Sequence, residues 1–176
     1  MSDLSLPGDV EAILIDVPDF PVAGVLFKDL TALFGDAQLC RRIVHDIAAR
    51  HTATADVVAG IEARGFIFGA LVAQELGLPF VPIRKQGKLP RATYAVTYDL
   101  EYGSATVEMH RDAVREGQRV LLIDDVLATG GTAAAAAGLV RQAAGVITAL
   151  EVLVEIEALS GRGAVPHVEV TSLLTC

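Results

Sequence analysis

The segment from residue 120 to residue 144 constrains the fold more than any other part of this 176-residue chain. It starts with a continuous apolar run, Val120 to Ile123, and two adjacent acids, Asp124 and Asp125, follow directly. A loop of small residues then leads into an alanine-rich stretch. A short apolar run without alternation is typical of a strand that is buried on both faces, as in a parallel sheet. The segment therefore predicts a buried strand, a turn and a helix that packs on the sheet.

Strand-like and helix-like segments alternate along the rest of the chain. The hydrophobic pattern predicts strands over residues 56–61, 80–83, 106–109, 120–123, 146–156 and 168–173, and helices over residues 10–15, 36–50, 66–76 and 132–144. This alternation is typical of an α/β protein in which a mostly parallel sheet is flanked by helices on both faces. Because no linker or internal repeat interrupts the pattern, we expect a single domain over residues 1–176. Ligands of such sheets bind at the carboxyl ends of the strands, which is where Asp124 and Asp125 lie.

The composition excludes several classes of protein. With 52% hydrophobic and 20% charged residues, the chain is typical of a globular protein. Its apolar runs stay below the roughly 18 residues that a membrane helix needs, and its N-terminus lacks the basic start of a signal peptide. We therefore expect a cytoplasmic protein without a membrane partner. The net charge of −8 argues against a nucleic-acid partner, and Cys40 and Cys176 have no metal-binding spacing.

One basic cluster interrupts this acidic chain. Four of its 14 lysines and arginines lie within residues 84–91, namely Arg84, Lys85, Lys88 and Arg91. A local positive patch of this kind suits a small polyanion. Composition alone slightly favours the simpler interpretation, a charged turn that is solvated.

The loop that follows the acid pair predicts a phosphate site. Ala128, Thr129, Gly130, Gly131 and Thr132 connect the predicted strand to the predicted helix. The backbone N–H groups at a helix N-terminus are free and lie at the positive end of the helix dipole, so they attract anions. Small residues let a phosphate approach this backbone, and the two threonines add hydroxyl donors. The loop matches neither GxxxxGK[ST] nor GxGxxG, so a monophosphate fits it better than a dinucleotide.

The acid pair extends this prediction to a sugar. Carboxylates accept hydrogen bonds from hydroxyl groups and can hold Mg²⁺ through water. Either acid alone is adequately explained as the polar end of a strand. The pair directly before a phosphate loop instead favours a phosphorylated ribose, with its phosphate on the loop and its hydroxyls on Asp124 and Asp125.

The same segment carries a resemblance to a known family. Residues 121–132, LLIDDVLATGGT, resemble the ribose-phosphate signature of the type I phosphoribosyltransferases. Four further segments resemble the adenine-specific members of that family: FPVAGVLFKD (20–29), GIEARGF (60–66), IRKQGKLP (83–90) and YDLEYG (98–103). The resemblance implies the type I phosphoribosyltransferase fold, with a small N-terminal hood and a mobile lid loop. It also implies transfer of ribose 5-phosphate from phosphoribosyl pyrophosphate (PRPP) to adenine, with release of pyrophosphate.

Roles for the phosphate loop, the acids and the lid follow from this resemblance. It implies that residues 128–132 hold the 5-phosphate of PRPP. Asp124 and Asp125 are implied to contact the ribose hydroxyls and to stabilise positive charge on the ring. Residues 86–103 correspond to the lid, where Glu101 is implied to exchange a proton with the purine as general acid or base. Mg²⁺ is the implied cofactor, held through substrate and water, with Asp124 and Asp125 as candidate ligands.

The resemblance also implies sites for the leaving group and the base. The pyrophosphate site comprises Glu62, Ala63, Arg64, Arg84, Lys85 and Lys88. A cis peptide bond is expected between Glu62 and Ala63, whereas the residues alone explain Arg64 equally well as a surface arginine. The adenine site comprises Leu26, Phe27 and Lys28. Members of the family are commonly homodimers, so a second copy of the chain is the expected partner.

Three alternatives remain open at this point. The first is a hypoxanthine, guanine or xanthine phosphoribosyltransferase. Lys28 stands where many members of the family have arginine, which leaves the base open, although YDLEYG argues against this alternative. The second is a regulator that senses PRPP and binds nucleic acid without catalysis, which the charge of −8 disfavours. The third is a generic nucleotide-binding module, which the acid pair together with Glu101 disfavours.

Overall fold

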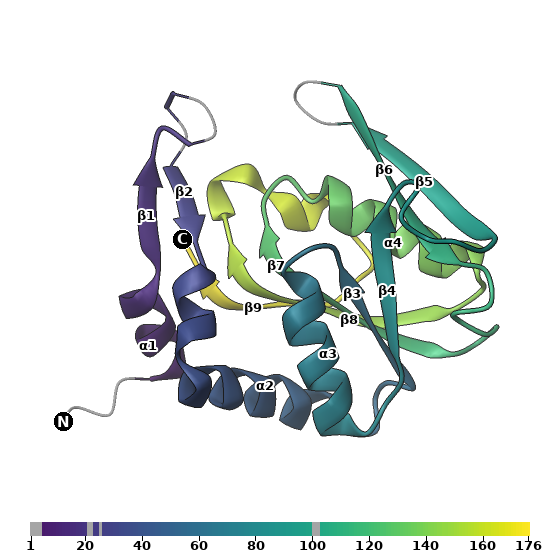
Figure 1. The fold of residues 1–176 in the computed structure, drawn as a ribbon, viewed down its shortest axis with the longest axis horizontal. Coiled ribbons are helices and arrows are strands. Elements are labelled where there is room, and N and C mark those ends of the chain that lie inside the picture. The colour runs from purple at the N-terminus through teal and green to yellow at the C-terminus, as the bar shows by residue number, and fades with distance from the viewer. Residues whose placement is uncertain (1–4, 21–22, 25, 100–102) are drawn as a thin grey trace. The chain divides into compact units, whose positions relative to one another are not determined.

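A seven-stranded sheet organises residues 47–176 of the computed structural model, which describes residues 5–20, 23–24, 26–99 and 103–176. The strands are β3 (Val57–Ile61), β4 (Phe80–Lys85), β5 (Thr93–Asp99), β6 (Ser104–His110), β7 (Arg119–Leu127), β8 (Val146–Glu155) and β9 (Val170–Thr175). Their order across the sheet is β5-β6-β4-β3-β7-β8-β9 (Figure 1). The five strands from β4 to β9 in this order are parallel, whereas β6 is antiparallel to both of its neighbours. The mostly parallel sheet predicted from the sequence is thus confirmed.

Two helices cover opposite faces of this sheet, as predicted. On β3, alternate residues (Val57, Ala59 and Ile61) belong to a buried core that includes the alanines of α4 (Gly131–Gln142). The intervening Gly60 lies against α3 (Gly65–Leu76), so closely that a Cβ there would approach the carbonyl oxygen of Gly65 to 2.9 Å. Side chains that alternate along a strand therefore pack on α4 on one face and on α3 on the other.

Two predictions about the strands need correction. Residues 86–103 contain β5, which pairs with β6 in an antiparallel hairpin, although the sequence pattern predicted no strand there. The strand predicted over residues 120–123 continues to Leu127, because its ladder with β8 continues through the pairs Asp124–Val152 and Val126–Val154. The two acids therefore lie within the last part of β7 and not after its end.

The connection between β8 and β9 packs at the carboxyl edge of the sheet. Two short 3₁₀ helices, η2 (Glu157–Leu159) and η3 (Gly161–Ala164), connect β8 to β9. The backbone N–H of Ile156 donates to the carbonyl of Leu127 (2.9 Å), so this connection starts beside the end of β7. None of the helices in the described part of the chain is long and apolar enough to cross a membrane.

The N-terminal residues form a second compact unit, residues 1–46. It contains α1 (Leu6–Ile13), β1 (Ile15–Pro18), β2 (Leu26–Asp29), η1 (Thr31–Gly35) and the start of α2 (Ala37–His51). The first helix begins earlier than predicted because the Ser5 side chain caps it, accepting a hydrogen bond from the backbone of Gly8 (3.4 Å). Strands β1 and β2 pair as an antiparallel hairpin that the prolines and glycines of the sequence concealed. This unit corresponds in sequence to the expected hood, and its role as a hood, like the single-domain organisation, stays a prediction.

Candidate active site

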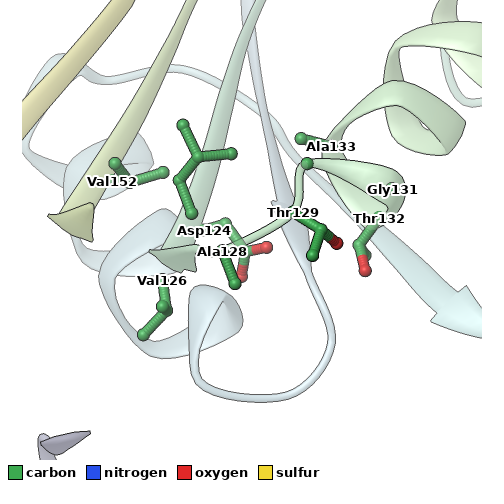
Figure 2. Close-up of a pocket in the computed structure, with 10 residues that line it drawn as sticks. Asp124, Val126, Ala128, Thr129, Gly131, Thr132, Ala133 and Val152 are labelled. Carbon is green, nitrogen blue, oxygen red and sulfur yellow. The ribbon is translucent and has the colours of Figure 1, made fainter. Parts of the chain in front are cut away.

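The phosphate loop lies where the sequence predicted it, between β7 and α4. Gly130 is the N-cap of α4 and adopts φ +82°, a left-handed conformation that favours glycine. It has no side chain with which to cap the helix, so the first N–H groups of α4 are free to bind a ligand. Loop and strand enclose a pocket of about 70 Å³ (Figure 2). This volume suits a phosphate group, since pockets for whole drug-sized ligands occupy about 300–1,000 Å³.

Of the acid pair, Asp124 borders this pocket. Asp124 and Asp125 are each only 8% exposed, and Asp124 lines the pocket with the loop residues (Figure 2). The Asp124 carboxylate accepts a hydrogen bond from the backbone N–H of Asp125 (2.9 Å). Asp125 forms an ion pair with the guanidinium of Arg64. Its Oδ2 atom is buried and has the Arg64 guanidinium as its partner, so a ligand that engages Arg64 would release this oxygen.

The surroundings of Asp124 oppose its ionisation. Burial raises the pKa of Asp124 well above its ordinary value, and the negative charge of Asp125 raises it further. The positive charge of Arg64 lowers this pKa but does not compensate. A buried acid whose charge is so poorly compensated is a frequent feature of functional sites, because a ligand can supply the missing partners.

The turn before α3 has the cis peptide bond that the resemblance implied, between Glu62 and Ala63. The Glu62 carboxylate accepts hydrogen bonds from the backbone N–H of Lys85 (3.0 Å) and from Arg84 Nε (3.3 Å). Burial alone raises the pKa of Glu62, but these hydrogen bonds and the two positive charges outweigh it and lower the pKa below its ordinary value. Glu62 therefore joins this turn to the basic segment on β4.

Gly65 brings the same turn against the acid pair, a role that sequence reasoning missed. A Cβ at Gly65 would approach the carbonyl oxygen of Ile123 to 2.9 Å and the Asp124 carboxylate to 3.1 Å. Only glycine lets the start of α3 pack so closely on β7, and this packing places Arg64 beside Asp125. The glycine of the GIEARGF motif was the available signal, but its partner is distant in sequence.

In the basic segment, residues 84–91, the Arg84 side chain and the Lys85 backbone contact Glu62. Arg84 Nη1 donates to the Lys88 carbonyl (3.1 Å), which fixes the bend between these residues. The side chains of Lys85 and Lys88 are exposed. Arg91 differs, because it forms an ion pair with Asp112 on the surface. The buried Glu108, to which sequence reasoning gave no role, accepts a hydrogen bond from the Gly87 backbone (3.0 Å) and so stabilises the bend.

The expected lid, residues 86–103, includes β5, which pairs with β6, while Glu101 lies outside the described residues. The described part of the hairpin contacts the phosphate loop. Thr132 Oγ1 donates a hydrogen bond to Tyr98 Oη (3.0 Å), and a Cβ at Gly131 would meet the Tyr98 ring at 3.1 Å. Sequence reasoning gave Tyr98 no such role.

The three residues expected to bind adenine lie in the N-terminal unit, on β2. The ring of Phe27 packs edge-on against Phe20, with 5.1 Å between ring centroids. Lys28 forms an ion pair with Asp16 (2.6 Å). The backbone of Leu26 is part of the strand, and its side chain is outside the described set. The structure thus brings together the predicted phosphate, ribose and pyrophosphate residues, while the adenine residues belong to a separately described unit.

Comparisons with known proteins agree with this arrangement. Residues 31–157 match the model of a family described as phosphoribosyl transferase domain. An adenine phosphoribosyltransferase from Thermosynechococcus vestitus is 49% identical over 168 residues, which cover 95% of this chain and 99% of the relative. The crystal structure of the Thermoanaerobacter pseudethanolicus adenine phosphoribosyltransferase has a TM-score of 0.93 at 41% identity, covering 98% of this chain and all (100%) of that one.

A second solved structure is informative for its ligands. The adenine phosphoribosyltransferase of Saccharomyces cerevisiae, in complex with adenine and D-2,5-dideoxy-2,5-imino-altritol 1,6-bisphosphate, has a TM-score of 0.92 at 34% identity. The alignment covers 96% of this chain and 98% of the yeast chain. Fold, family model and near-complete coverage agree, and the acid pair, the phosphate loop and the Glu62 turn all lie within the matched residues. The chain therefore belongs to the adenine phosphoribosyltransferases of the phosphoribosyl transferase family.

Proposed function

We propose that the carboxyl edge of the sheet binds PRPP together with Mg²⁺ and transfers its ribose 5-phosphate to adenine, giving AMP and pyrophosphate. The observation that carries this proposal is the buried, poorly compensated acid pair directly beside the uncapped N-terminus of α4. That juxtaposition suits a ligand with a phosphate and vicinal hydroxyls. The relatives named adenine phosphoribosyltransferase, and the adenine bound to the yeast enzyme, support adenine as the acceptor.

In this proposal, the loop of residues 128–132 holds the 5-phosphate. The helix dipole and the free N–H groups favour the dianion, and Thr129 adds a hydroxyl. Thr132 already donates to Tyr98, so its hydroxyl would have to change partner to reach the phosphate. A fixed phosphate turns the attack at ribose C1 into a reaction of positioned groups.

The acids act on the ribose. Asp124 and Asp125 accept hydrogen bonds from its 2- and 3-hydroxyls, which supplies the partners that the carboxylates lack. Pyrophosphate leaves from C1 as adenine N9 attacks, and the ring then carries positive charge. Two carboxylates in a water-poor site stabilise that charge more strongly than they would in water.

The pyrophosphate group is assigned to the Glu62 turn and the basic segment. Arg64 exchanges its ion pair with Asp125 for the incoming phosphates, and Lys85 and Lys88 neutralise the leaving group. Glu62 holds Arg84 and the Lys85 backbone in place, so it acts on pyrophosphate through them. Glu101 on the expected lid would exchange the purine proton, a role that rests on the family resemblance.

Magnesium fits the same place. The buried Oδ2 of Asp125 is paired with Arg64, and once Arg64 turns to the incoming phosphates it becomes a hard oxygen ligand of the kind that Mg²⁺ prefers, directly or through water. The described residues contain no group of three His, Cys, Asp or Glu side chains that could hold a metal by themselves. Mg²⁺ would accordingly be held mainly by PRPP oxygens and water beside Asp124 and Asp125, and it would offset the charge of the departing pyrophosphate.

A base panel tests the proposal. Purified protein is incubated with PRPP, Mg²⁺ and either adenine, hypoxanthine, guanine or xanthine, and nucleotide and pyrophosphate are quantified. AMP from adenine alone is the expected result, and it would show that Lys28 is compatible with adenine. Product from another base would move the specificity, and no product with any base would leave a PRPP-binding protein without catalysis. Removal of Mg²⁺ with a chelator should abolish AMP formation, and undiminished activity would contradict the metal requirement.

A homodimer in the cytoplasm completes the proposal. The family resemblance supports the dimer, and α3 offers a candidate contact surface because Ile67 and Leu71, one helical turn apart, are 42% and 43% exposed. Leu71→Glu should then shift the protein toward monomers in analytical ultracentrifugation. A wild-type protein that sediments as a monomer at micromolar concentration would contradict the dimer.

A further inference from the structure

The backbone of the phosphate loop contacts η3 (Gly161–Ala164), which has no assigned role in the proposed reaction. Gly161, the first residue of η3, lies directly behind the loop and is buried. A Cβ at Gly161 would overlap the carbonyl oxygen of Ala128 and would come within 2.9 Å of the Leu127 side chain. A Cβ at Gly130 would in turn overlap the carbonyl oxygen of Gly161. Because Gly130 and Gly161 have no side chains, the backbone of η3 touches the backbone of the phosphate loop.

An ion pair between a half-exposed arginine and a buried glutamate anchors this segment. Arg162 Nε and Nη2 donate to the two oxygens of Glu155, each at 2.6 Å, in a bidentate pair. Arg162 Nη1 also donates to the carbonyl of Val170 (2.7 Å), and Ser172 Oγ donates to Glu155 (2.8 Å). One guanidinium thus joins the end of β8, the start of β9 and η3. Planar bidentate pairs of this kind fix geometry as well as charge.

The anchor is connected directly to the strand that carries the acids. Glu155 is paired with Leu127 in the ladder between β7 and β8, and only 5% of Glu155 is exposed. Hydrogen bonding from Arg162 is the largest influence on the pKa of Glu155 and lowers it below its ordinary value. Glu155 is therefore ionised at neutral pH, and the network persists under the conditions of catalysis.

The loop itself needs such support. Ala128, Thr129 and Gly130 have small side chains, and Gly130 is in a left-handed conformation that no capping side chain stabilises. A loop of this composition is intrinsically variable in conformation, whereas tight phosphate binding requires N–H groups that are already oriented. On its α4 side, the Thr132–Tyr98 hydrogen bond restrains the loop. On its strand side, the neighbouring support is Gly161.

We propose that Gly161 and Arg162 are positioning residues for the PRPP 5-phosphate: Arg162 fixes η3 on Glu155, and Gly161 holds the backbone of residues 128–130 in its phosphate-binding form. The proposal rests on the assignment of this loop to the 5-phosphate. It concerns binding of the phosphate and not the chemistry at C1, so the loss of either residue should weaken PRPP binding and leave the adenine site unaffected.

Gly161→Ala and Gly163→Ala form a matched pair that tests the proposal. Gly163 lies two residues away in the same 3₁₀ helix, it is exposed, and a Cβ there would meet no atom within 4 Å. Calorimetry with ribose 5-phosphate measures the phosphate site whether or not AMP is formed. We expect binding to weaken about tenfold or more in Gly161→Ala, as a small displacement of a binding group would cause, and to change less than about twofold in Gly163→Ala.

Kinetics separate positioning from a general loss of structure. Gly161→Ala should raise KM for PRPP and leave both kcat and KM for adenine close to wild type, because the 5-phosphate is bound equally in the ground and transition states. Lower folded stability alone would reduce the active fraction without changing KM. Failure of wild type to form AMP, with ribose 5-phosphate still bound, would refute the proposed reaction but leave this comparison valid.

Arg162→Lys provides a second route should Gly161→Ala fold poorly. Lysine keeps the positive charge but cannot contact both Glu155 oxygens and the Val170 carbonyl together. We expect a smaller rise in the dissociation constant for ribose 5-phosphate, about threefold to tenfold, at unchanged affinity for adenine. The proposal would be overturned if folded Gly161→Ala and Arg162→Lys bound ribose 5-phosphate as tightly as Gly163→Ala does.

Discussion

Two buried carboxylates on neighbouring strands have pKa values that are shifted in opposite directions. Asp124 on β7 is paired in the ladder with Val152, and Glu151 on β8 lies one position earlier, opposite Ile123. Asp124 is 8% exposed and Glu151 is fully buried (0%). Nevertheless, the pKa of Asp124 lies well above its ordinary value, whereas that of Glu151 lies below.

Their partners explain the difference. Burial raises the pKa of Glu151, but hydrogen bonds from His51 (2.6 Å) and from Arg50 (2.9 and 3.1 Å) outweigh that effect. Asp124 receives one backbone hydrogen bond and has a second carboxylate as its neighbour. A buried acid with a complete set of partners stabilises the fold, while one with missing partners is held ready for a ligand. Burial alone therefore does not distinguish a structural carboxylate from a functional one.

The largest effect is expected for Asp125→Asn, at the under-compensated end of β7. The variant removes a negative charge from beside the ribose, so the transition state loses electrostatic stabilisation. We expect kcat to fall about a hundredfold to a thousandfold, comparable with the loss of a single oxyanion-hole group in other enzymes. Steady-state assays of AMP formation measure this, with thermal unfolding as the check that the fold is intact. Kinetics like those of wild type would remove the acid pair from the mechanism.

Glu151→Gln tests the fully compensated carboxylate. Glutamine conserves the volume, but it weakens the charge-assisted hydrogen bonds to Arg50 and His51. Such bonds contribute about 1.5–3 kcal/mol each, and because the Arg50 side chain is 33% exposed, water screens the loss, so we expect about 1.5–2 kcal/mol in total. Urea denaturation measures the loss. The kcat/KM of the folded variant should stay within about twofold of wild type, and a large fall would mean that Glu151 also serves the active site.

The sequence predicted the central strands and helices better than the edges of the sheet. Residues 57–61, 120–125 and 149–155 are buried on both faces, so each strand has an apolar run of its own. The hairpins of β1 with β2 and of β5 with β6 were missed because their pairing, and not a local apolar pattern, makes them strands.

The candidate site divides in the same way. Contiguous motifs predicted the phosphate loop, the acids and the cis peptide bond between Glu62 and Ala63. The contact of Gly65 with β7, and that of Gly161 with the phosphate loop, join residues about 30 to 60 positions apart, so neither segment alone identifies its partner. The roles of Glu101 and of residues 26–28 stay predictions.

Asp124→Asn should expose the energetic cost of the functional acid. Because folding raises the pKa of Asp124, the folded state binds more protons than the unfolded state between the two pKa values. The free energy of unfolding therefore falls as the pH rises from about 4 through the raised pKa. Asparagine cannot ionise, so the variant should match wild type near pH 4 and exceed its Tm at pH 8, by about 2–4 °C for each 1 kcal/mol of relief. A variant that is less stable than wild type at pH 8 would contradict the account of Asp124 as poorly compensated.

The smallest effect is expected at the opposite, amino edge of the sheet, where Asp56, directly before β3, is a compensated but exposed acid. Its carboxylate accepts hydrogen bonds from Arg119 Nη2 (2.7 Å), Nε (3.1 Å) and backbone N–H (2.8 Å), and side-chain hydrogen bonding to Arg119 is the main cause that lowers its pKa to about 2. A lowered pKa contributes stability that is complete above the unfolded value of about 4 and is lost as the pH falls through 2.

Asp56→Asn should therefore lower Tm slightly at pH 7, by no more than a surface ion pair typically contributes. Its difference from wild type should shrink between pH 4 and pH 2, which is the reverse of the trend for Asp124→Asn. Thermal unfolding of both variants over pH 2–8, at low and at high salt, makes the comparison, and salt should reduce only the effect at the exposed pair. If the Tm difference from wild type changed with pH in the same direction for both variants, the number of hydrogen-bonding partners would not distinguish the structural acids of this sheet from the functional ones.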